Sequence, residues 1–504
     1  MRVLFVSSEI YPLAKTGGLA DVSAALPIAL AALGVDVRLV MPGYPEALDT
    51  ADDVKVEAQC GHNGARTRVL SARLPDSGLP VWLVDCPALF KRDGGLYQTA
   101  DGADWHDNHH RFSLLSRVAA KLAMGEIVAG WRADVVHAND WHTGLTPLLL
   151  KKAGAPPATL FTIHNLAFQG LFPAGALGEL KLPTELLGPD GIEFYGRISF
   201  LKAGIRYSDR VNTVSPAYAR EILSPEFGCG LDGLLKERAA DLSGILNGID
   251  CAVWNPASDP LLPARFDAHS MAGKHVCKAE LQRELGLDAA PDTPLVVWAS
   301  RLAHQKMTDT TLEMLPALME RDVQFALIGE GDPAYERGFA ELARAYPGRV
   351  AARIGYEEAL AHRFYAAGDI LLHPSRFEPC GLTPQYAMRY GAIPVVTSVG
   401  GLTDTVRDAD AQTMRAGTAT GFSFKEQSAP AMLACLDRAL DAYAQPFNWR
   451  RLQRQAMGQE FGWQASAARY LALYRKLAPL APQVSGEPPP LAPAEAEAKP
   501  FAAA

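Results

Sequence analysis

Short, continuous runs of Val, Ile and Leu recur along this chain between longer segments of helical character. The first series occupies residues 3–6, 37–41, 81–84, 135–137, 159–163 and 210–214. Strands that are apolar throughout, rather than on alternate residues, are typical of a parallel sheet covered by helices on both faces. The pattern therefore predicts an α/β fold of the doubly wound, Rossmann-like kind.

The series pauses at a turn-rich stretch, residues 246–256, and then restarts. The second series occupies residues 295–299, 324–328, 350–354, 370–373 and 393–397. A single core rarely grows beyond roughly 250 to 300 residues, so a chain of 504 residues has room for two. We predict a first domain at residues 1–245 and a second at 246–460, which face each other across a deep cleft at the carboxyl ends of their strands.

The C-terminal part of the chain changes character. An amphipathic pattern over residues 463–477 predicts a late helix, and we expect the segment 461–480 to pack back on the first domain. Residues 481–504 are a mixture of Pro, Ala and Glu with few large apolar side chains. Such a composition does not offset the entropy of ordering, so we predict a disordered tail.

Composition excludes several classes of protein. A formal net charge of −8 disfavours a nonspecific nucleic-acid binder. The seven cysteines are scattered without a C-x-x-C pair, which indicates reduced thiols rather than disulfides or zinc ligands. The sequence has no leader pattern and no run of 18 apolar residues. We therefore expect a cytoplasmic protein without a membrane partner, and its oligomeric state stays open.

The motif KTGGLADV begins at Lys15, between the apolar run at residues 3–6 and a helical segment at 22–33. This loop would suit an anionic ligand. It has little side-chain bulk, it leads into the unpaired N–H groups of a helix start, and Lys15 adds a positive charge. The spacing matches neither the phosphate loop nor the dinucleotide-binding turn, which disfavours kinases and dehydrogenases. An ordinary strand-to-helix turn with a solvated lysine remains an alternative.

Two loops of the second half also follow predicted strands. SRLAHQK places Arg301 and Lys306 where two cations could hold a diphosphate. PSRFEPCGLT offers the carboxylate of Glu378 for sugar hydroxyls, followed by backbone N–H groups at residues 381–383. A solvated loop for the first motif, and a helix-capping role for Glu378 in the second, are the alternatives.

In the first half, HANDWHTG and FTIHNLAFQG follow predicted strands and direct five side chains toward the cleft: Asp140, Trp141, His142, His164 and Asn165. The spacing of the histidines gives little support for a metal site. His109 and His110 are adjacent on a helical segment, where neighbouring side chains should point apart. A structural histidine remains the alternative for His164.

Taken together, these motifs resemble the bacterial glycogen synthase and plant starch synthase family, which are retaining glycosyltransferases of the GT-B fold. The resemblance extends over about residues 1–478 and rests on KTGGLADV, HANDWH, FTIHNLAFQG, ISFLKAG, LNGID, SRLAHQK, IGYEE and SRFEPCGLT. It implies transfer of glucose from ADP-glucose to the non-reducing end of an α-1,4-glucan, in glycogen biosynthesis. ADP-glucose is then a substrate, and no metal or other cofactor is expected.

The resemblance also implies roles for individual residues. As catalytic residues it implies His164, Arg301, Lys306, Glu378 and Asp140. As the donor site it implies Lys15, Gly17, Gly18, Arg301, Lys306, Tyr356, Glu378, Cys380, Gly381, Leu382 and Thr383. Asn247 and Trp141 would contact the acceptor or the transferred sugar. The sequence leaves four points open: the preference for ADP over UDP, the primer length, allosteric control and the details of the retaining route.

The chain departs from the family pattern at three positions. Met307 stands where Gly is common, Asn139 where His is frequent, and Pro384 where Gln is common. Met307 would alter the donor loop if that position takes positive φ, whereas Pro384 is harmless in the first turn of a helix. Cys380 has no evident histidine partner, so we expect it to pack near the nucleotide rather than act as a nucleophile.

Two alternatives to a glucan synthase stay open. One is a GT-B transferase that acts on a small acceptor, which the KTGGLADV motif disfavours. The other is a catalytically silent glucan-binding relative, which the presence of Lys15, Arg301, Lys306 and Glu378 disfavours.

Overall fold

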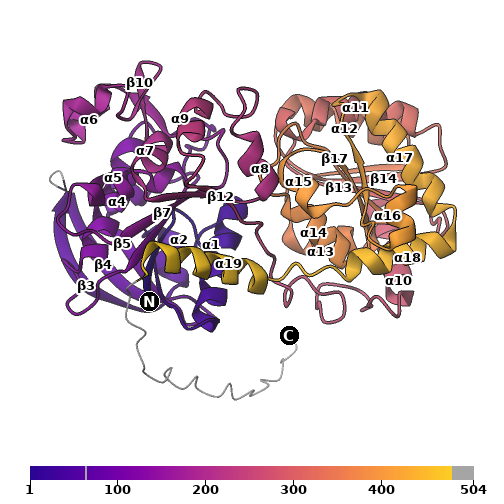
Figure 1. Cartoon of the computed structure of the whole chain (residues 1–504). Helices are drawn as coiled ribbons and strands as arrows, with labels where there is room; N and C mark the ends of the chain where they lie inside the picture. The colour runs from indigo at the N-terminus through magenta and orange to yellow at the C-terminus, as the bar shows by residue number, and fades with distance from the viewer. Residues whose placement is uncertain (63–64, 480–504) are drawn as a thin grey trace, which may run out of the picture.

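The computed structural model describes residues 1–62 and 65–479, which form two units side by side (Figure 1). The first unit is built on a sheet of strand order β12-β11-β7-β6-β1-β2-β5-β4-β3, and the second on one of order β15-β14-β13-β16-β17-β18. A small sheet of order β8-β10-β9 belongs to the first unit. The predicted tail at residues 481–504 lies outside the described residues.

In the first unit the strands are β1 (Arg2–Val6), β2 (Asp36–Pro42), β3 (Asp52–His62), β4 (Ala65–Arg73), β5 (Pro80–Asp85), β6 (Val135–Asn139), β7 (Ala158–Ile163), β8 (Leu171–Pro173), β9 (Glu193–Phe194), β10 (Arg197–Ser199), β11 (Arg210–Thr213) and β12 (Leu242–Gly244). The helices are α1 (Gly18–Ala32), α2 (Pro45–Thr50), α3 (Pro87–Phe90), α4 (Asn108–Met124), α5 (Leu145–Lys151), α6 (Ala176–Glu179), α7 (Phe200–Tyr207), α8 (Pro216–Glu221) and α9 (Asp232–Glu237).

In the second unit the strands are β13 (Leu295–Ala299), β14 (Gln324–Gly329), β15 (Val350–Ile354), β16 (Ile370–His373), β17 (Ile393–Thr397) and β18 (Phe422–Phe424). The helices are α10 (Ala272–Leu285), α11 (Thr308–Leu318), α12 (Pro333–Ala345), α13 (Glu358–Ala367), α14 (Leu382–Arg389), α15 (Gly400–Thr405), α16 (Ala411–Ala416), α17 (Ala429–Tyr443) and α18 (Pro446–Met457). The last helix, α19 (Trp463–Leu477), follows. Short 3₁₀ turns lie at Trp141–Thr143, Thr184–Leu187 and His304–Lys306.

Both main sheets are largely parallel, as the continuous apolar runs predict. In the first, β1 pairs with β2 and β6, and in the second, β13 pairs with β14 and β16, all in parallel. The exception is the edge of the first sheet, where β3 and β4 are antiparallel. This pair was not predicted, because much of β3 is exposed and its apolar residues are interrupted by polar ones, as expected for a strand at a sheet edge.

Each unit has its own core. The larger core of the first unit contains the buried strands β1, β2, β5 and β6, and Trp463, Tyr470 and Tyr474 of α19 belong to it. The core of the second unit surrounds β13, β14, β16 and β17. The chain thus crosses back after α18, and Figure 1 shows α19 lying along the first unit beside α1.

Helices α8 and α15 meet at the junction of the two units (Figure 1). The hydroxyl of Ser215, which caps α8, donates to the carbonyl of Pro379 at 2.7 Å, and the backbone N–H of Gly400 donates to Oε1 of Glu221 at 2.7 Å. These contacts bring the segment 378–404 of the second unit against the first. The loops at the carboxyl ends of the two sheets are therefore brought toward one another.

Two smaller findings bear on the composition. The thiols of Cys86, Cys229, Cys251, Cys277, Cys380 and Cys435 are free, as predicted for those positions, whereas the side chain of Cys60 lies outside the described residues. Among the described helices, none combines the length and the apolar character that crossing a bilayer requires.

Candidate active site

The donor residues predicted for the second unit lie at the point where its strand order reverses. Strand β13 is the first strand of this sheet in the sequence, and it lies between β14 on one side and β16 on the other. Ligands of open α/β sheets bind outside the carboxyl ends of the strands at such a point. The loop after β13 carries Arg301 and Lys306, and the loop after β16 carries Glu378.

Lys306 and Glu378 form a buried ion pair across these two loops. The ammonium of Lys306 contacts Oε2 of Glu378, which also accepts a hydrogen bond from the hydroxyl of Ser375 at 2.8 Å. Nε2 of His373 lies 3.5 Å from the same oxygen. Burial raises the pKa of the Glu378 carboxyl, but Lys306 and His373 outweigh that effect and hold its pKa well below the usual range. The carboxylate is therefore ionised and available to accept from hydroxyls.

Further contacts hold the two loops together. The guanidinium of Arg376 makes a bidentate pair with Asp309, with both N···O distances at 2.9 Å. The backbone N–H of Arg376 donates to the carbonyl of Gln305 at 2.8 Å, and the amide of Gln305 donates to the carbonyl of Phe377 at 3.1 Å. Because these contacts join the two loops through backbone and side chains alike, they hold Lys306 and Glu378 in position before any ligand arrives.

Met307, which stands where glycine is common in the family, has the left-handed backbone conformation that glycine adopts readily. Its φ is 50° and its ψ 38°, and its side chain is fully buried in the core of the second unit. A side chain in this region costs roughly 1–2 kcal/mol relative to glycine, whereas burying a methionine side chain stabilises by about 1.5–3 kcal/mol. The loop therefore keeps the backbone shape that glycine would allow, and burial of Met307 offsets the strain.

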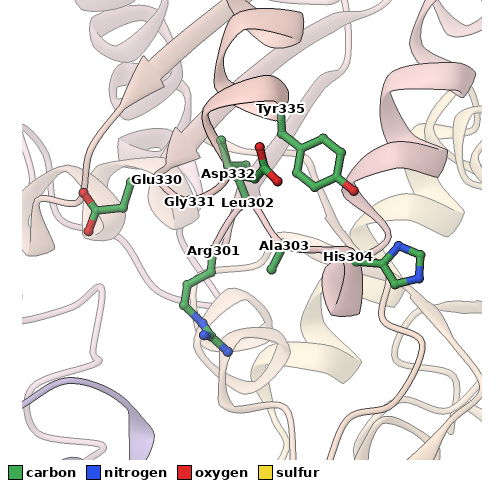
Figure 2. A pocket seen from close by; sticks show the side chains of 8 residues that line it. All are labelled: Arg301, Leu302, Ala303, His304, Glu330, Gly331, Asp332 and Tyr335. Carbon is green, nitrogen blue, oxygen red and sulfur yellow. The ribbon is translucent and has the colours of Figure 1, made fainter. Parts of the chain in front are cut away.

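Arg301 is exposed and faces a hollow of about 320 Å³. The hollow lies between the loops after β13 and β14, and Figure 2 shows its lining: Arg301, Leu302, Ala303, His304, Glu330, Gly331, Asp332 and Tyr335. In this view the guanidinium of Arg301 points away from Tyr335 and His304. Among the residues that the structure describes, the Arg301 side chain makes one hydrogen bond, a long one to Oε1 of Gln305 at 3.4 Å, so most of its N–H groups remain available to an anion.

The start of α14 provides the backbone donors predicted at residues 381–383. Gly381 caps the helix with a φ of 82°, and a Cβ there would lie 2.6 Å from Leu402, so both conformation and space require glycine. Pro384 lies in the first turn, where its missing N–H costs nothing. Cys380 is buried, and burial raises the pKa of its thiol to about 12, which agrees with a packing role.

On the facing unit, the loop that carries Lys15 is held by a buried carboxylate that sequence analysis missed. Oε2 of Glu9 accepts the backbone N–H of Thr16 at 2.5 Å and that of Gly17 at 3.3 Å. Its Oε1 accepts the hydroxyl of Tyr97 at 3.0 Å. The N–H of Gly17 is therefore engaged by Glu9, and in helix α1, which begins at Gly18, the first N–H groups are the ones without an intrahelical partner.

Lys15 reaches the second unit directly. Its ammonium lies 2.9 Å from Oδ1 of Asp21 and 3.7 Å from Oε2 of Glu358 at the start of α13. Burial lowers the pKa of Lys15, but the attraction of Asp21 and Glu358 outweighs it and raises the pKa overall. Tyr356, two residues before Glu358, is 59% exposed, so its ring is open to a ligand. Lys15 and Tyr356 thus lie near one another although they come from different units.

Asp140 and His164 lie together at the carboxyl ends of β6 and β7. Oδ1 of Asp140 accepts the backbone N–H of His164 at 2.7 Å and that of Asn165 at 3.4 Å. Burial raises the pKa of Asp140 to about 7 and lowers that of His164 to about 3. Asp140 has a φ of 56°, a strained value for a residue other than glycine. Strain of this kind is tolerated where the surrounding structure holds the backbone.

Asn139, which replaces the more frequent histidine of the family, sets the hydrogen-bonding state of His164. Its amide nitrogen donates to the carbonyl of Val6 at 3.0 Å, which leaves Oδ1 to face Nε2 of His164 at 3.0 Å. Because an amide oxygen only accepts, Nε2 must carry the hydrogen. Because burial lowers the pKa of His164 to about 3, the ring is neutral and its Nδ1 carries no proton.

Three other residues that the sequence predicts to face the cleft or a sugar are Trp141, Asn247 and His142. Trp141 packs over Gly170, where a Cβ would lie 2.4 Å from the indole ring. Asn247 is buried with its Oδ1 unpartnered among the described residues, so it has an acceptor to offer to a ligand. His142, which the sequence predicts to point toward the cleft, is buried and stacks on the ring of Tyr97, with the ring centroids 4.3 Å apart.

The prediction for His109 and His110 is wrong. Both Nε2 atoms approach Oε2 of Glu179, at 3.0 and 3.1 Å, and the two rings lie 4.2 Å apart. Glu179 ends α6, which approaches the start of α4, so a shared acceptor draws the adjacent side chains to one side. Among the described residues these three form the one group with the geometry for a metal ion, and it contains no residue predicted for the donor site.

Comparison with known proteins places these observations in a family. Residues 2–237 match the model of the starch synthase catalytic domain, and residues 293–441 match that of the glycosyl transferases group 1. The glycogen synthase of Burkholderia thailandensis is 54% identical over 482 residues, which cover 94% of this chain and 90% of that protein. The glycogen synthase of Paramagnetospirillum magneticum is 52% identical over 483 residues, covering 95% and 98%.

Two solved structures are similar to this chain over most of its length. The catalytic domain of starch synthase IV from Arabidopsis thaliana, bound to ADP and acarbose, has a TM-score of 0.86 and 34% identity, covering 95% of this chain and 99% of that one. A sucrose-phosphate synthase from Thermosynechococcus elongatus shares only the fold, with a TM-score of 0.58, 19% identity, and coverage of 94% and 98%. The resemblance and the GT-B fold predicted from the sequence are confirmed. The chain belongs to the family of glycogen and starch synthases and is a glucosyltransferase.

Proposed function

We propose that the protein transfers glucose from ADP-glucose to the non-reducing end of an α-1,4-glucan, with retention of the anomeric configuration. The observation that carries the proposal is the placement of Arg301, Lys306 and Glu378 at the strand reversal of the second sheet, near the Lys15 loop of the first unit. The relatives named glycogen synthase support the reaction, and the solved relative that holds ADP and acarbose supports the choice of nucleotide and glucan.

The donor would lie between the two units. Arg301 and Lys306 would bind its diphosphate and stabilise the charge that develops on the departing ADP. Lys15 and the first N–H groups of α1, including Gly18, would meet the distal phosphate from the facing unit. Tyr356 would cover a face of the adenine. In this role the cations replace the metal ion, so we propose that the reaction needs neither a metal nor another cofactor.

The transferred glucose would be held by residues of both units. Glu378 would accept its hydroxyls, and the free acceptor of Asn247 would orient it. Asp140 and the neutral ring of His164 would lie near the anomeric carbon, where positive charge develops in an oxocarbenium-like transition state. The aromatic face of Trp141 would contact the acceptor. Closure of the two units around the donor would exclude water, which would otherwise hydrolyse it.

The test is transfer of labelled glucose to glycogen from ADP-glucose and from UDP-glucose in parallel, with free glucose as a competing acceptor. Label in polymer from ADP-glucose is the expected result. Transfer from UDP-glucose alone would overturn the nucleotide assignment. Label in a small product, or no transfer by a folded protein, would overturn the polymer assignment. The cytoplasmic location expected from the sequence stays a prediction.

A further inference from the structure

Two histidines and a carboxylate meet where the start of α4 approaches the end of α6. Nε2 of His109 lies 3.0 Å from Oε2 of Glu179, and Nε2 of His110 lies 3.1 Å from the same oxygen. Figure 1 shows α6 at the end of the first unit that is remote from the second unit. The cluster is therefore separate from the donor residues, and none of its three side chains has a part in the proposed transfer of glucose.

The distances within the cluster fit a single metal ion. Two ligands that each lie about 2.0–2.1 Å from a tetrahedral zinc ion are about 3.3 Å apart. The two N···O distances fall short of that separation by only about 0.2–0.3 Å. All three ligand atoms lie within 4.8 Å of one another. Because the side chain of Glu179 is 57% exposed, it is free to make the small shift that admits an ion.

The histidine rings already have the orientation that an ion needs. Adjacent side chains of a helix normally point apart, yet the ring centroids of His109 and His110 are only 4.2 Å from each other. His109 is buried, and its ring packs against that of Phe172 at 5.5 Å between centroids. This packing restricts the ring, so less conformational entropy is lost when a ligand binds.

The carboxylate is kept near the histidines by a contact that does not involve its own side chain. The guanidinium of Arg117, farther along α4, donates to the carbonyl of Leu180. Leu180 directly follows Glu179, the last residue of α6. The backbone that carries the carboxylate is therefore tied to the helix that carries both histidines.

The chemistry of the three ligands selects the kind of metal. Imidazole nitrogens suit divalent transition ions such as zinc, whereas magnesium and calcium prefer a shell of oxygen ligands. Two histidines and one glutamate form a known set of zinc ligands, which leaves a fourth position for water. The exposure of Glu179 gives water access to that position.

We propose that His109, His110 and Glu179 bind a zinc ion that joins α4 to α6, stabilises the first unit and takes no part in glucose transfer. A ligand that binds the folded state alone raises the free energy of unfolding in proportion to the logarithm of its concentration over Kd. Zinc should therefore raise the Tm of the first unit.

The experiment compares His110→Gln with His275→Gln, which alters an exposed histidine on α10 of the second unit. Parent and variants are freed of metal with EDTA, dialysed, and titrated with zinc chloride or magnesium chloride by calorimetry and thermal denaturation. In the parent and in His275→Gln, a hundredfold excess of zinc over Kd should raise the Tm by roughly 5–10 °C. In His110→Gln zinc should bind more than tenfold more weakly, since loss of even an outer-shell partner costs about 10–100-fold. Magnesium should have no effect.

Two further measurements identify the ligands. Glu179→Gln keeps an oxygen that accepts hydrogen bonds from both rings but removes the charge, so it should weaken zinc binding while leaving the Tm of the metal-free protein nearly unchanged. Cobalt in place of zinc should show the visible bands of nitrogen and oxygen ligands. A thiolate band would locate the ion at a cysteine, such as the exposed Cys229, and overturn the proposal.

The remaining outcomes are equally clear. Equal zinc affinity in the parent and His110→Gln, or no zinc binding by the parent, overturns the site. Binding that leaves the Tm unchanged overturns its stabilising role, and a loss of glucose transfer that zinc alone restores overturns its separation from the reaction. A protein that binds zinc through these residues but transfers no glucose would refute the proposed function and leave the zinc site standing.

Discussion

Replacing Lys306 by alanine should separate its structural role from its catalytic one. A cation on an exposed loop would leave folding almost undisturbed, but Lys306 is paired with the buried carboxylate of Glu378. Removal of one partner of a buried ion pair costs about 3–5 kcal/mol, because the other charge is left uncompensated. In a domain of this size each kcal/mol lowers Tm by roughly 2–4 °C. The second unit should therefore melt roughly 10 °C earlier.

The pH dependence follows from the sign of the pKa shift of Glu378. In the parent that pKa is depressed, so the pair contributes stability above the unfolded value of about 4.3, and the contribution is lost as the pH falls. In Lys306→Ala the opposing effect of burial dominates and raises the pKa of Glu378. The variant then loses stability as the pH rises above about 4.3. The difference in Tm between parent and variant should widen from pH 5 to pH 8.

The assay combines calorimetry at both pH values with turnover from ADP-glucose. The double variant Lys306→Ala, Glu378→Gln removes the orphaned charge, so it should recover most of the lost Tm. It should not recover activity, since loss of one preorganised group of this kind lowers kcat by about 10²–10³. A Tm for Lys306→Ala equal to that of the parent at pH 8 would refute the structural part. Unchanged turnover would remove Lys306 from the transition state.

Three further predictions concern other parts of the site. EDTA should leave glucose transfer intact, because the proposed mechanism gives the role of a metal to side-chain cations; inhibition that magnesium reverses would contradict this. Activity should fall as the pH drops through about 7, where Asp140 becomes protonated, and Asp140→Asn should show a low rate without that limb; an unaltered limb would assign it to another group. Gly170→Ala should lower the Tm of the first unit by several degrees and weaken acceptor binding, because its Cβ would meet the Trp141 ring at 2.4 Å. Gly130→Ala is its control, since Gly130 has a φ of 79° in open space, so equal effects would attribute the loss to conformation alone.

Most of the two main sheets could be predicted because their strands are buried on both faces. The eleven continuous apolar runs coincide with strands to within two residues at each end. The strands that were missed have a different environment. β3 and β4 form an antiparallel edge, whereas β8, β9, β10, β12 and β18 are only two or three residues long. Such strands depend on their partners more than on a local hydrophobic pattern, so their sequences do not distinguish them from loops.

The placement of Arg301, Lys306 and Glu378 at one edge could likewise be anticipated, since parallel strands end at the same side of a sheet. The pairing of Lys306 with Glu378, however, could not be anticipated. Lys306 and Glu378 are 72 positions apart, and the sequence does not tell whether each meets solvent or the other. The same limit applies to Glu9, whose burial and two backbone partners arise only when the loop at residues 15–17 folds over it.

The residues that were missed share a physical role, which is to orient another group rather than to contact a ligand. Glu9, which was not named, holds the backbone of the Lys15 loop, whereas Asn139 was named only as a departure from the family pattern, and its role in determining which nitrogen of His164 carries the hydrogen was missed. Ligand contacts need charge or hydroxyl chemistry at a strand end, and that combination is visible in a motif. An orienting residue is defined by a single geometric relation to its neighbour. Asn139 shows the consequence: it departs from the family pattern, yet its amide oxygen satisfies Nε2 of His164, so a change in residue type need not change the state of the group it positions.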